Sequence, residues 1–70
     1  MDEFYMVSFE VTGNFYFFHD HEKAAAFLLE SYFDDTIVEN EDECMAINNE
    51  VADNDGIEGY GWIDKVWFED

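Results

Sequence analysis

Residues 4–18, with the sequence FYMVSFEVTGNFYFF, have the pattern of a β-hairpin. In the first half, alternate positions place four apolar side chains on one face of a strand: Tyr5, Val7, Phe9 and Val11. Gly13 and Asn14 then predict a two-residue type II′ turn, because glycine takes a positive φ angle at little cost. The aromatic run Phe15–Phe18 follows as the second strand.

This turn fixes a register and two faces of the predicted hairpin. On the face expected to be buried, the cross-strand pairs are Val11 with Tyr16 and Phe9 with Phe18. The opposite face carries four more apolar side chains: Phe4, Met6, Phe15 and Phe17. Either a second helix covers them, or they contact a partner or a second copy of the chain in a homodimer. We expect a contact at one edge of this patch.

A helix is predicted from about His21 to Phe33. Asp20 is a suitable N-cap residue, and Glu22 places a carboxylate in the first turn, where the helix dipole favours it. The segment that follows is rich in strong helix formers and has an apolar stripe of Ala25, Leu28, Leu29 and Tyr32. This helix would close over the hairpin as a ββα unit.

The second half of the chain has weaker signals. Residues 36–38 can form a short strand, and Asn40 with Glu43 has the spacing of a capping box before a helix over residues 41–52. In that helix, one face would carry Cys44, Ile47 and Val51. The alternative is that residues 44–47 form a strand paired with residues 36–38. Residues 53–56 resemble a turn, and residues 60–68 alternate as a final strand.

These elements predict one α+β domain over residues 1–70. It has a small antiparallel sheet, made of the N-terminal hairpin and the C-terminal strand, packed with one or two helices. Hairpin, helix and last strand all turn four side chains toward the expected core: Tyr16, Phe18, Leu28 and Trp62.

The net charge of the chain is extreme for its size. Nineteen Asp and Glu residues against two lysines give a formal charge of −17. Chains so charged usually stay disordered for lack of apolar surface, but here the hydrophobic fraction is 49% and the aromatic fraction 20%. We therefore expect an ordered domain of modest stability, because one small core must also offset charge repulsion.

Several compartments and partners are disfavoured by the composition. The single cysteine, Cys44, excludes an intrachain disulfide framework, and no apolar run reaches the roughly 18–20 residues that span a bilayer. We expect a soluble, cytoplasmic protein. Anionic membranes and nucleic-acid backbones would repel it, so we expect it to bind neither directly.

The acidic side chains concentrate between residues 34 and 58, where no lysine interrupts them. The candidate binding surface consists of Asp34, Asp35, Glu39, Glu41, Asp42, Glu43, Glu50, Asp53, Asp55 and Glu58, called the acidic segment below. Solubility needs a net charge of only about 2–8. Adaptation to high salt would not account for the eight phenylalanines, so we interpret the segment as functional.

A length comparison indicates what such a surface could imitate. Duplex DNA carries about one charge per 1.7 Å of axis, so 17 charges correspond to roughly 29 Å of duplex. A compact domain of this length would have a diameter just under about 30 Å by the usual size scaling. The charge per unit length would then match that of DNA.

Catalytic and metal sites lack support in the sequence. In an EF-hand loop with Gly56 at its sixth position, Val51 and Trp62 would fall at the first and twelfth positions, where they cannot ligate calcium. With Gly59 in that position, the twelfth residue is Lys65. His19 and His21 lack the partners of a zinc site, and no phosphate loop or nucleophile motif is present. We expect no cofactor and no enzymatic activity, and we interpret Cys44 as a core residue.

In size, acidity and absence of enzymatic motifs, the chain resembles the small phage-encoded inhibitors that mimic DNA, including anti-restriction, anti-CRISPR and uracil-DNA glycosylase inhibitor proteins. The resemblance rests on the acidic run from Asp34 to Glu58 and on the overall charge. It implies a stoichiometric inhibitor of a nucleic-acid-binding host protein, acting in the host cytoplasm. The alternatives are an antitoxin-like cap for a basic protein and a subunit that binds through its apolar patch.

Overall fold

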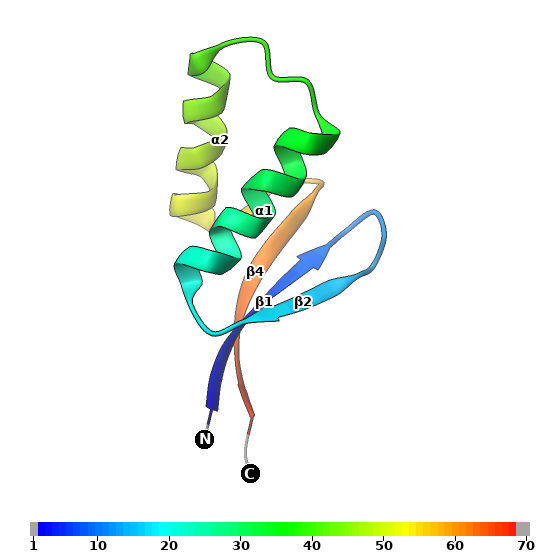
Figure 1. Ribbon diagram of the computed structural model, residues 1–70, viewed down its shortest axis with the longest axis vertical. Coiled ribbons are helices and arrows are strands. Elements are labelled where there is room, and N and C mark those ends of the chain that lie inside the picture. The colour runs from blue at the N-terminus through cyan, green and yellow to red at the C-terminus, as the bar shows by residue number, and fades with distance from the viewer. Residues whose placement is uncertain (1, 69–70) are drawn as a thin grey trace.

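The computed structural model describes residues 2–68, which form an antiparallel sheet and two helices (Figure 1). The elements in chain order are β1 (Asp2–Phe9), β2 (Phe15–Phe18), α1 (His21–Asp35), α2 (Glu41–Asn54), β3 (Gly56–Ile57) and β4 (Gly61–Phe68). The strands lie in the order β2-β1-β4-β3, and every neighbouring pair is antiparallel. The predicted α+β class is therefore confirmed. Within residues 2–68, no helix is long and apolar enough to cross a membrane.

The hairpin forms, but its turn differs from the predicted one. Tyr5 pairs with Phe18 and Val7 with Tyr16, so the predicted register is wrong. The amide of Phe9 donates to the carbonyl of Asn14 at 2.9 Å, and the amide of Gly13 donates to the carbonyl of Phe9 at 2.9 Å. The hydrogen-bonded residues Phe9 and Asn14 thus close a four-residue loop, residues 10–13, in place of the two-residue turn, with Gly13 at φ 73°.

The physical reason lies in the central position of β1. Its other edge pairs with β4 along its whole length, and Phe9 there lies opposite Gly61. The amide of Glu10 extends this contact with a 2.8 Å hydrogen bond to the carbonyl of Tyr60. Because the register differs from the prediction by an even number of positions, the side chains within β1 and β2 keep their predicted faces. Val11 does not, because it lies in the loop beyond the end of β1 and is 82% exposed instead of packing opposite Tyr16.

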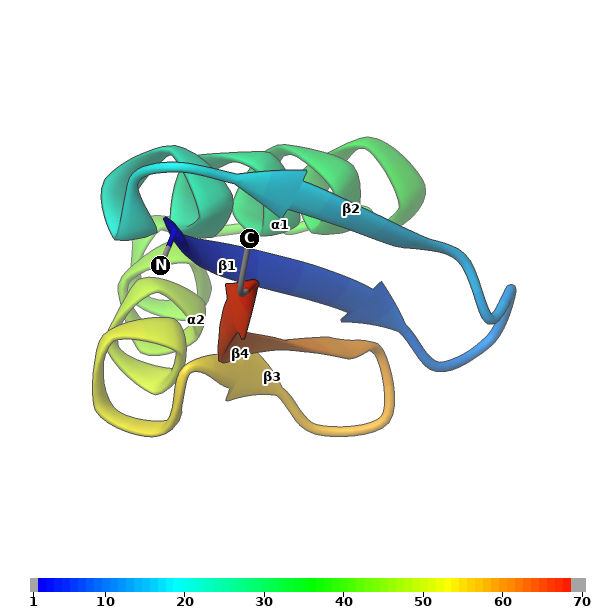
Figure 2. The same ribbon diagram turned by 90° about the horizontal axis from the view of Figure 1, so that it is seen from below.

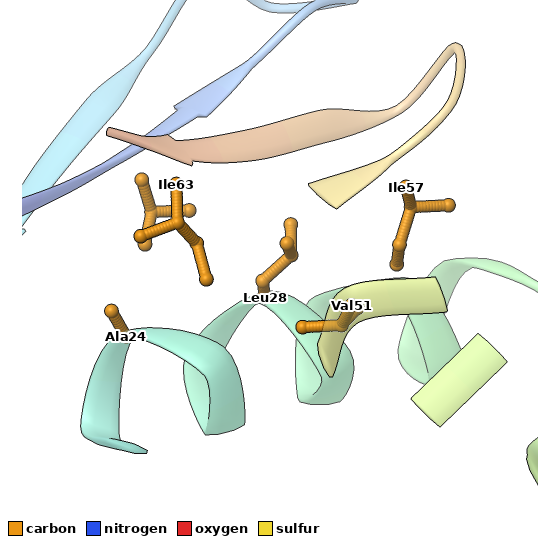
Figure 3. Close-up of a cluster of buried hydrophobic side chains, with 6 residues drawn as sticks. Ala24, Leu28, Val51, Ile57 and Ile63 are labelled. Carbon is orange, nitrogen blue, oxygen red and sulfur yellow. The ribbon is translucent and has the colours of Figure 1, made fainter. Parts of the chain in front are cut away.

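Both helices lie on one side of the sheet, and the hydrophobic core fills the space between the helices and the sheet (Figure 3). Figure 2 shows α1 along the β2 side of the sheet and α2 nearer to β3. The buried side chains are Val7, Ala24, Leu28, Val51, Ile57 and Ile63. Leu28 is fully buried and points from α1 toward the strands, where Gly61 leaves room for it: a Cβ atom there would lie 3.1 Å from Leu28 Cδ1. The sheet and the helices are therefore held together by one small aliphatic core.

Two of the four predicted core residues lie elsewhere. Leu28 is in the core and Phe18 packs partly buried against it, but Tyr16 and Trp62 are exposed, at 44% and 42%. Trp62 lies opposite Ser8 in the ladder, so the buried face of β4 carries Ile63 instead. Alternation along the strand was predicted correctly, but the wrong face was assigned to the core.

The second half of the chain differs from the prediction at both ends of α2. The helix itself is confirmed, and the alternative strand over residues 44–47 is wrong. Residues 36–38 form no strand and instead connect the two helices, because both helices lie on the same side of the sheet and the link between them stays in the helix layer (Figure 1). The predicted turn over residues 53–56 is shorter than expected, because residues 53 and 54 belong to α2 and residue 56 belongs to the short strand β3. This strand adds to the other edge of the sheet by pairing with β4.

Candidate functional site

The acidic segment follows α2 and the loops at its two ends. Five of its members lie on α2 itself, which at about 1.5 Å per residue is roughly 21 Å long. Asp34 and Asp35 precede it at the end of α1, Glu39 lies in the connecting loop, and Asp55 and Glu58 follow it. In Figure 1 this path runs along the upper loop and down the outer side of the helix layer. The structure thus places these residues along one continuous path of the backbone, and nine of the ten are exposed.

The sequence around Asn40 explains why the acidic helix forms. The side chain of Asn40 accepts a 2.9 Å hydrogen bond from the amide of Glu43, as a capping box requires. The Glu43 carboxylate accepts from the amide of Glu39, one residue before the expected donor, at 3.4 Å. Acidic residues in this first turn interact favourably with the positive end of the helix dipole. The charge at this end is therefore compatible with helix stability.

The other end of α2 has no such compensation. Its last turn contains Asp53 and no basic residue, although the negative end of the dipole favours cations. Asp55 ends the helix in the left-handed conformation, at φ 54°, and its amide donates to the carbonyl of Val51 at 2.9 Å. This end of the helix adds its own negative potential to the acidic surface.

Besides Glu43, three carboxylates of the acidic segment are held by hydrogen bonds within the fold. Tyr60 donates its hydroxyl to Asp35 at 2.8 Å, and the amide of Glu58 donates to Glu50 at 2.8 Å. The ring of His21 lies 2.8 Å from the Asp55 carboxylate, which links the start of α1 to the end of α2. These bonds fix the positions of the acidic loops relative to the helices.

Neither lysine neutralises this surface. Lys65 pairs with Glu3 at 2.7 Å, and its hydrogen bond lowers the pKa of that carboxyl below its ordinary value. Lys23 lies 3.7 Å from Asp20 in a looser pair. Both partners lie outside residues 34–58, so His21 is the basic side chain that reaches the acidic segment.

The molecule is more elongated than the length comparison assumed. Its extents are 46 × 22 × 16 Å, whereas a diameter of about 30 Å was expected. Spread along 46 Å, 17 charges amount to one per roughly 2.7 Å. That linear density lies between the values of about 1.7 Å per charge for duplex DNA and 3.4 Å for one of its strands. The expected match to duplex DNA is corrected to this intermediate value.

The second candidate surface is the face of the sheet that carries no helix. Phe4, Met6, Phe15 and Phe17 lie there as predicted, and Trp62 joins them from β4. The rings of Phe15 and Phe17 pack edge to face at 5.7 Å, and those of Phe4 and Phe17 at 6.5 Å. Phe15 and Phe17 remain 59% and 44% exposed. Neither α1 nor α2 covers this patch, so of the two explanations considered for it, coverage by a helix is wrong.

A groove that sequence reasoning missed lies between the hairpin loop and the end of α1. It has a volume of about 420 Å³ and is lined by Phe9, Val11, Thr12, Asn14, Tyr16, Phe27, Ser31, Asp35 and Tyr60. Burial, followed by the hydrogen bond to Asp35 and the charges of Asp35 and Asp34, raises the pKa of Tyr60 to about 12. The density of aromatic residues was visible in the sequence, but their convergence depends on the three-dimensional pairing of three separate elements.

Two further features of the described part of the chain concern metal-ligating side chains and the single cysteine. Residues 2–68 contain no group of three His, Cys, Asp or Glu side chains placed to hold a metal ion. Cys44 is half-buried on the inward face of α2 and is not a member of the core. The structure presents three surface features: the acidic segment, the aromatic sheet face and the groove.

The fold and these surfaces define a small α+β protein whose acidic segment has no lysine counterion. No protein-family model, curated protein or solved structure matches this chain.

Proposed function

We propose that the chain is a stoichiometric inhibitor that presents its acidic segment to the nucleic-acid-binding site of a host protein. The observation that carries the proposal is the absence of lysine counterions along α2 and its loops: both lysines pair elsewhere, with Asp20 and Glu3. A protein that needed only solubility would not require so concentrated a field.

The physical mechanism is electrostatic steering followed by many small contacts. A groove that holds nucleic acid presents Lys and Arg side chains to successive phosphates, and a surface dense in carboxylates attracts the same groups. Because Asn40 caps α2 and Tyr60 and His21 hold the neighbouring carboxylates, the acidic segment is ordered before binding. Preorganisation reduces the entropy lost on association.

The test is capture of bacterial DNA-binding proteins on the immobilised chain, with two ways of elution. We expect a captured protein to be released by a 30-bp duplex at low salt as well as by rising sodium chloride. A captured protein that duplex DNA does not displace, or that binds DNA and the chain together, would contradict the proposal.

The second candidate function is an antitoxin-like or subunit-type module that binds a basic partner partly through apolar contact. The observation that favours it is the uncovered aromatic face of the sheet, where Phe15, Phe17 and Trp62 are exposed. Hydrophobic contacts persist at high salt, whereas the electrostatic contacts of a DNA mimic weaken. Retention of the partner above about 0.5 M sodium chloride would therefore favour this second function.

A further inference from the structure

The groove beside the end of α1 has the size and lining of a small binding site. Its volume of about 420 Å³ lies within the usual range of about 300–1,000 Å³ for ligand pockets. β1 and its loop form one wall, β2 contributes Tyr16, α1 contributes Phe27, Ser31 and Asp35, and Tyr60 closes the remaining side.

Four of the nine residues that line the groove are aromatic, and their packed rings are called the aromatic wall below. The ring of Phe9 packs edge to face against Tyr16, Phe27 and Tyr60, with centroid distances of 5.9, 5.8 and 5.6 Å. Tyr16 and Phe27 are 5.0 Å apart. Tyr16 is 44% exposed, so part of its ring remains accessible to a ligand. Ring faces are negative and attract cations, most strongly when the cation is partly desolvated.

Negative charge borders the aromatic wall on the α1 side. Asp34 and Asp35 stand in the last turn of α1, which contains no basic residue, and the helix dipole is negative at that end. Tyr60 donates to Oδ2 of Asp35, and no described residue donates to the other oxygen, Oδ1. The bond to Tyr60 therefore holds the Asp35 carboxylate in one orientation and leaves Oδ1 available to accept a hydrogen bond from a ligand.

We propose that this groove receives the guanidinium group of one arginine from the partner, stacked on the aromatic wall and hydrogen-bonded to Asp35. The inference rests on the proposed function, since nucleic-acid-binding sites supply arginines, and it assigns the anchor point of the complex. Arginine fits better than lysine because its planar group stacks on rings while its N–H groups bind a carboxylate. The rest of the acidic segment would then add steering and smaller contacts.

The experiment titrates the isotopically labelled chain with the peptide acetyl-Gly-Arg-Gly-amide and follows backbone amide shifts by NMR. The matched control peptide carries citrulline, which has the shape of arginine without its charge, and a third peptide carries lysine. We expect saturable shifts for the arginine peptide at Ser31, Asn14 and Tyr60. The citrulline and lysine peptides should bind about ten-fold and a few-fold more weakly, respectively.

Two variants locate the site. Asp35→Asn should weaken the arginine peptide several-fold, while Asp53→Asn, the same charge change on the exposed end of α2, should leave binding within about two-fold. Because Asp35→Asn also alters the bond to Tyr60, Tyr16→Leu provides a second variant that removes an accessible ring and should weaken binding too. A dispersed spectrum confirms that each variant is folded.

The proposal is overturned if the shifts spread along α2, if citrulline or lysine binds as well as arginine, or if Asp53→Asn weakens binding as much as Asp35→Asn. None of these outcomes bears on DNA displacement, which tests the proposed function separately. Conversely, a chain that binds the arginine peptide in the groove but never competes with DNA would retain this site and lose the proposed function.

Discussion

Replacing Leu28 with alanine tests whether the small aliphatic core holds the two helices on the sheet. Leu28 is fully buried between Val7, Val51, Ile57 and Ile63, all of them 6% exposed or less. The change removes about three methylene equivalents at about 0.8 kcal/mol each, and the cavity left behind raises the expected loss to about 2–5 kcal/mol. At about 0.05–0.15 kcal/mol per residue, the whole domain has roughly 3.5–10 kcal/mol of stability.

The assay is urea denaturation at 25 °C followed by circular dichroism, with Ile37→Ala as the matched control. Ile37 is 89% exposed in the loop between the helices, so its truncation should change the free energy of unfolding by about 0.5 kcal/mol or less. We expect Leu28→Ala to be largely unfolded or to lose at least about 2 kcal/mol. Equal denaturation midpoints for Leu28→Ala and Ile37→Ala would refute the assignment of the core.

Three further predictions concern the cap, the tyrosine and the charge. Asn40→Ala should destabilise the domain by about 0.5–2 kcal/mol through loss of the bond to Glu43, whereas Asn49→Ala on the exposed face of α2 should not; thermal melts compare them. Folding raises the pKa of Tyr60 from 10.0 to about 12. The neutral hydroxyl therefore contributes fully to the free energy of unfolding below pH 10, and this contribution is lost as the pH rises from 10 to 12. Tyr60→Phe should flatten that decline in denaturation experiments, and an unchanged slope would contradict the assignment. Sodium chloride should raise the melting temperature at neutral pH by screening carboxylate repulsion, and a melting temperature that falls with salt would show that attractive pairs dominate.

The helices could be predicted because their signals are local. Asn40 and Glu43 lie three positions apart in the chain and meet in the structure as a cap, so the start of α2 at Glu41 follows from the sequence. The stripe containing Leu28 likewise identified the buried side of α1. Such patterns depend on neighbours within one or two turns, which the sequence contains.

The hairpin register and the face of β4 could not be derived in this way. A Gly-Asn pair favours a two-residue turn, but the ladder between β1 and β4 holds Phe9 opposite Gly61 and leaves four residues in the loop. In β4, alternation separates Trp62 from Ile63 without showing which is buried. Asp64 lies on the same face as Trp62 and indicates that this face is exposed. Lys65 lies on the same face as Ile63 and gives the same indication for the opposite face, so the charged residues do not decide between the two. Lys65 and Trp67 can be exposed there because β1 and β4 extend beyond the helices (Figure 1).

The candidate site could be predicted only where it depends on local sequence and not on contacts between distant residues. Exposure of the acidic segment follows from charge alone, whereas the fixed positions of Asp35 and Asp55 depend on Tyr60 and His21, which lie 25 and 34 residues away. The groove requires side chains from the hairpin, α1 and the turn before β4 to converge. Its arginine-binding role and the inhibitory role of the acidic segment stay proposals until binding is measured.

The central claim is that carboxylates of the acidic segment take the place of nucleic-acid phosphates, and a competition titration tests it most directly. Labelled duplex DNA bound to the captured partner is titrated with the wild-type chain and with two quadruple variants, each four charges less negative. One neutralises Glu39, Glu41, Asp42 and Asp53, and the matched control neutralises Glu10, Glu22, Glu30 and Asp64, which are exposed outside residues 34–58.

We expect the first variant to displace DNA with an affinity lower by about two orders of magnitude or more, and the control to stay within about ten-fold of wild type, since only general steering is reduced. Equal losses for the two variants would show that net charge alone matters. Displacement by the first variant as strong as that by wild type would contradict the claim.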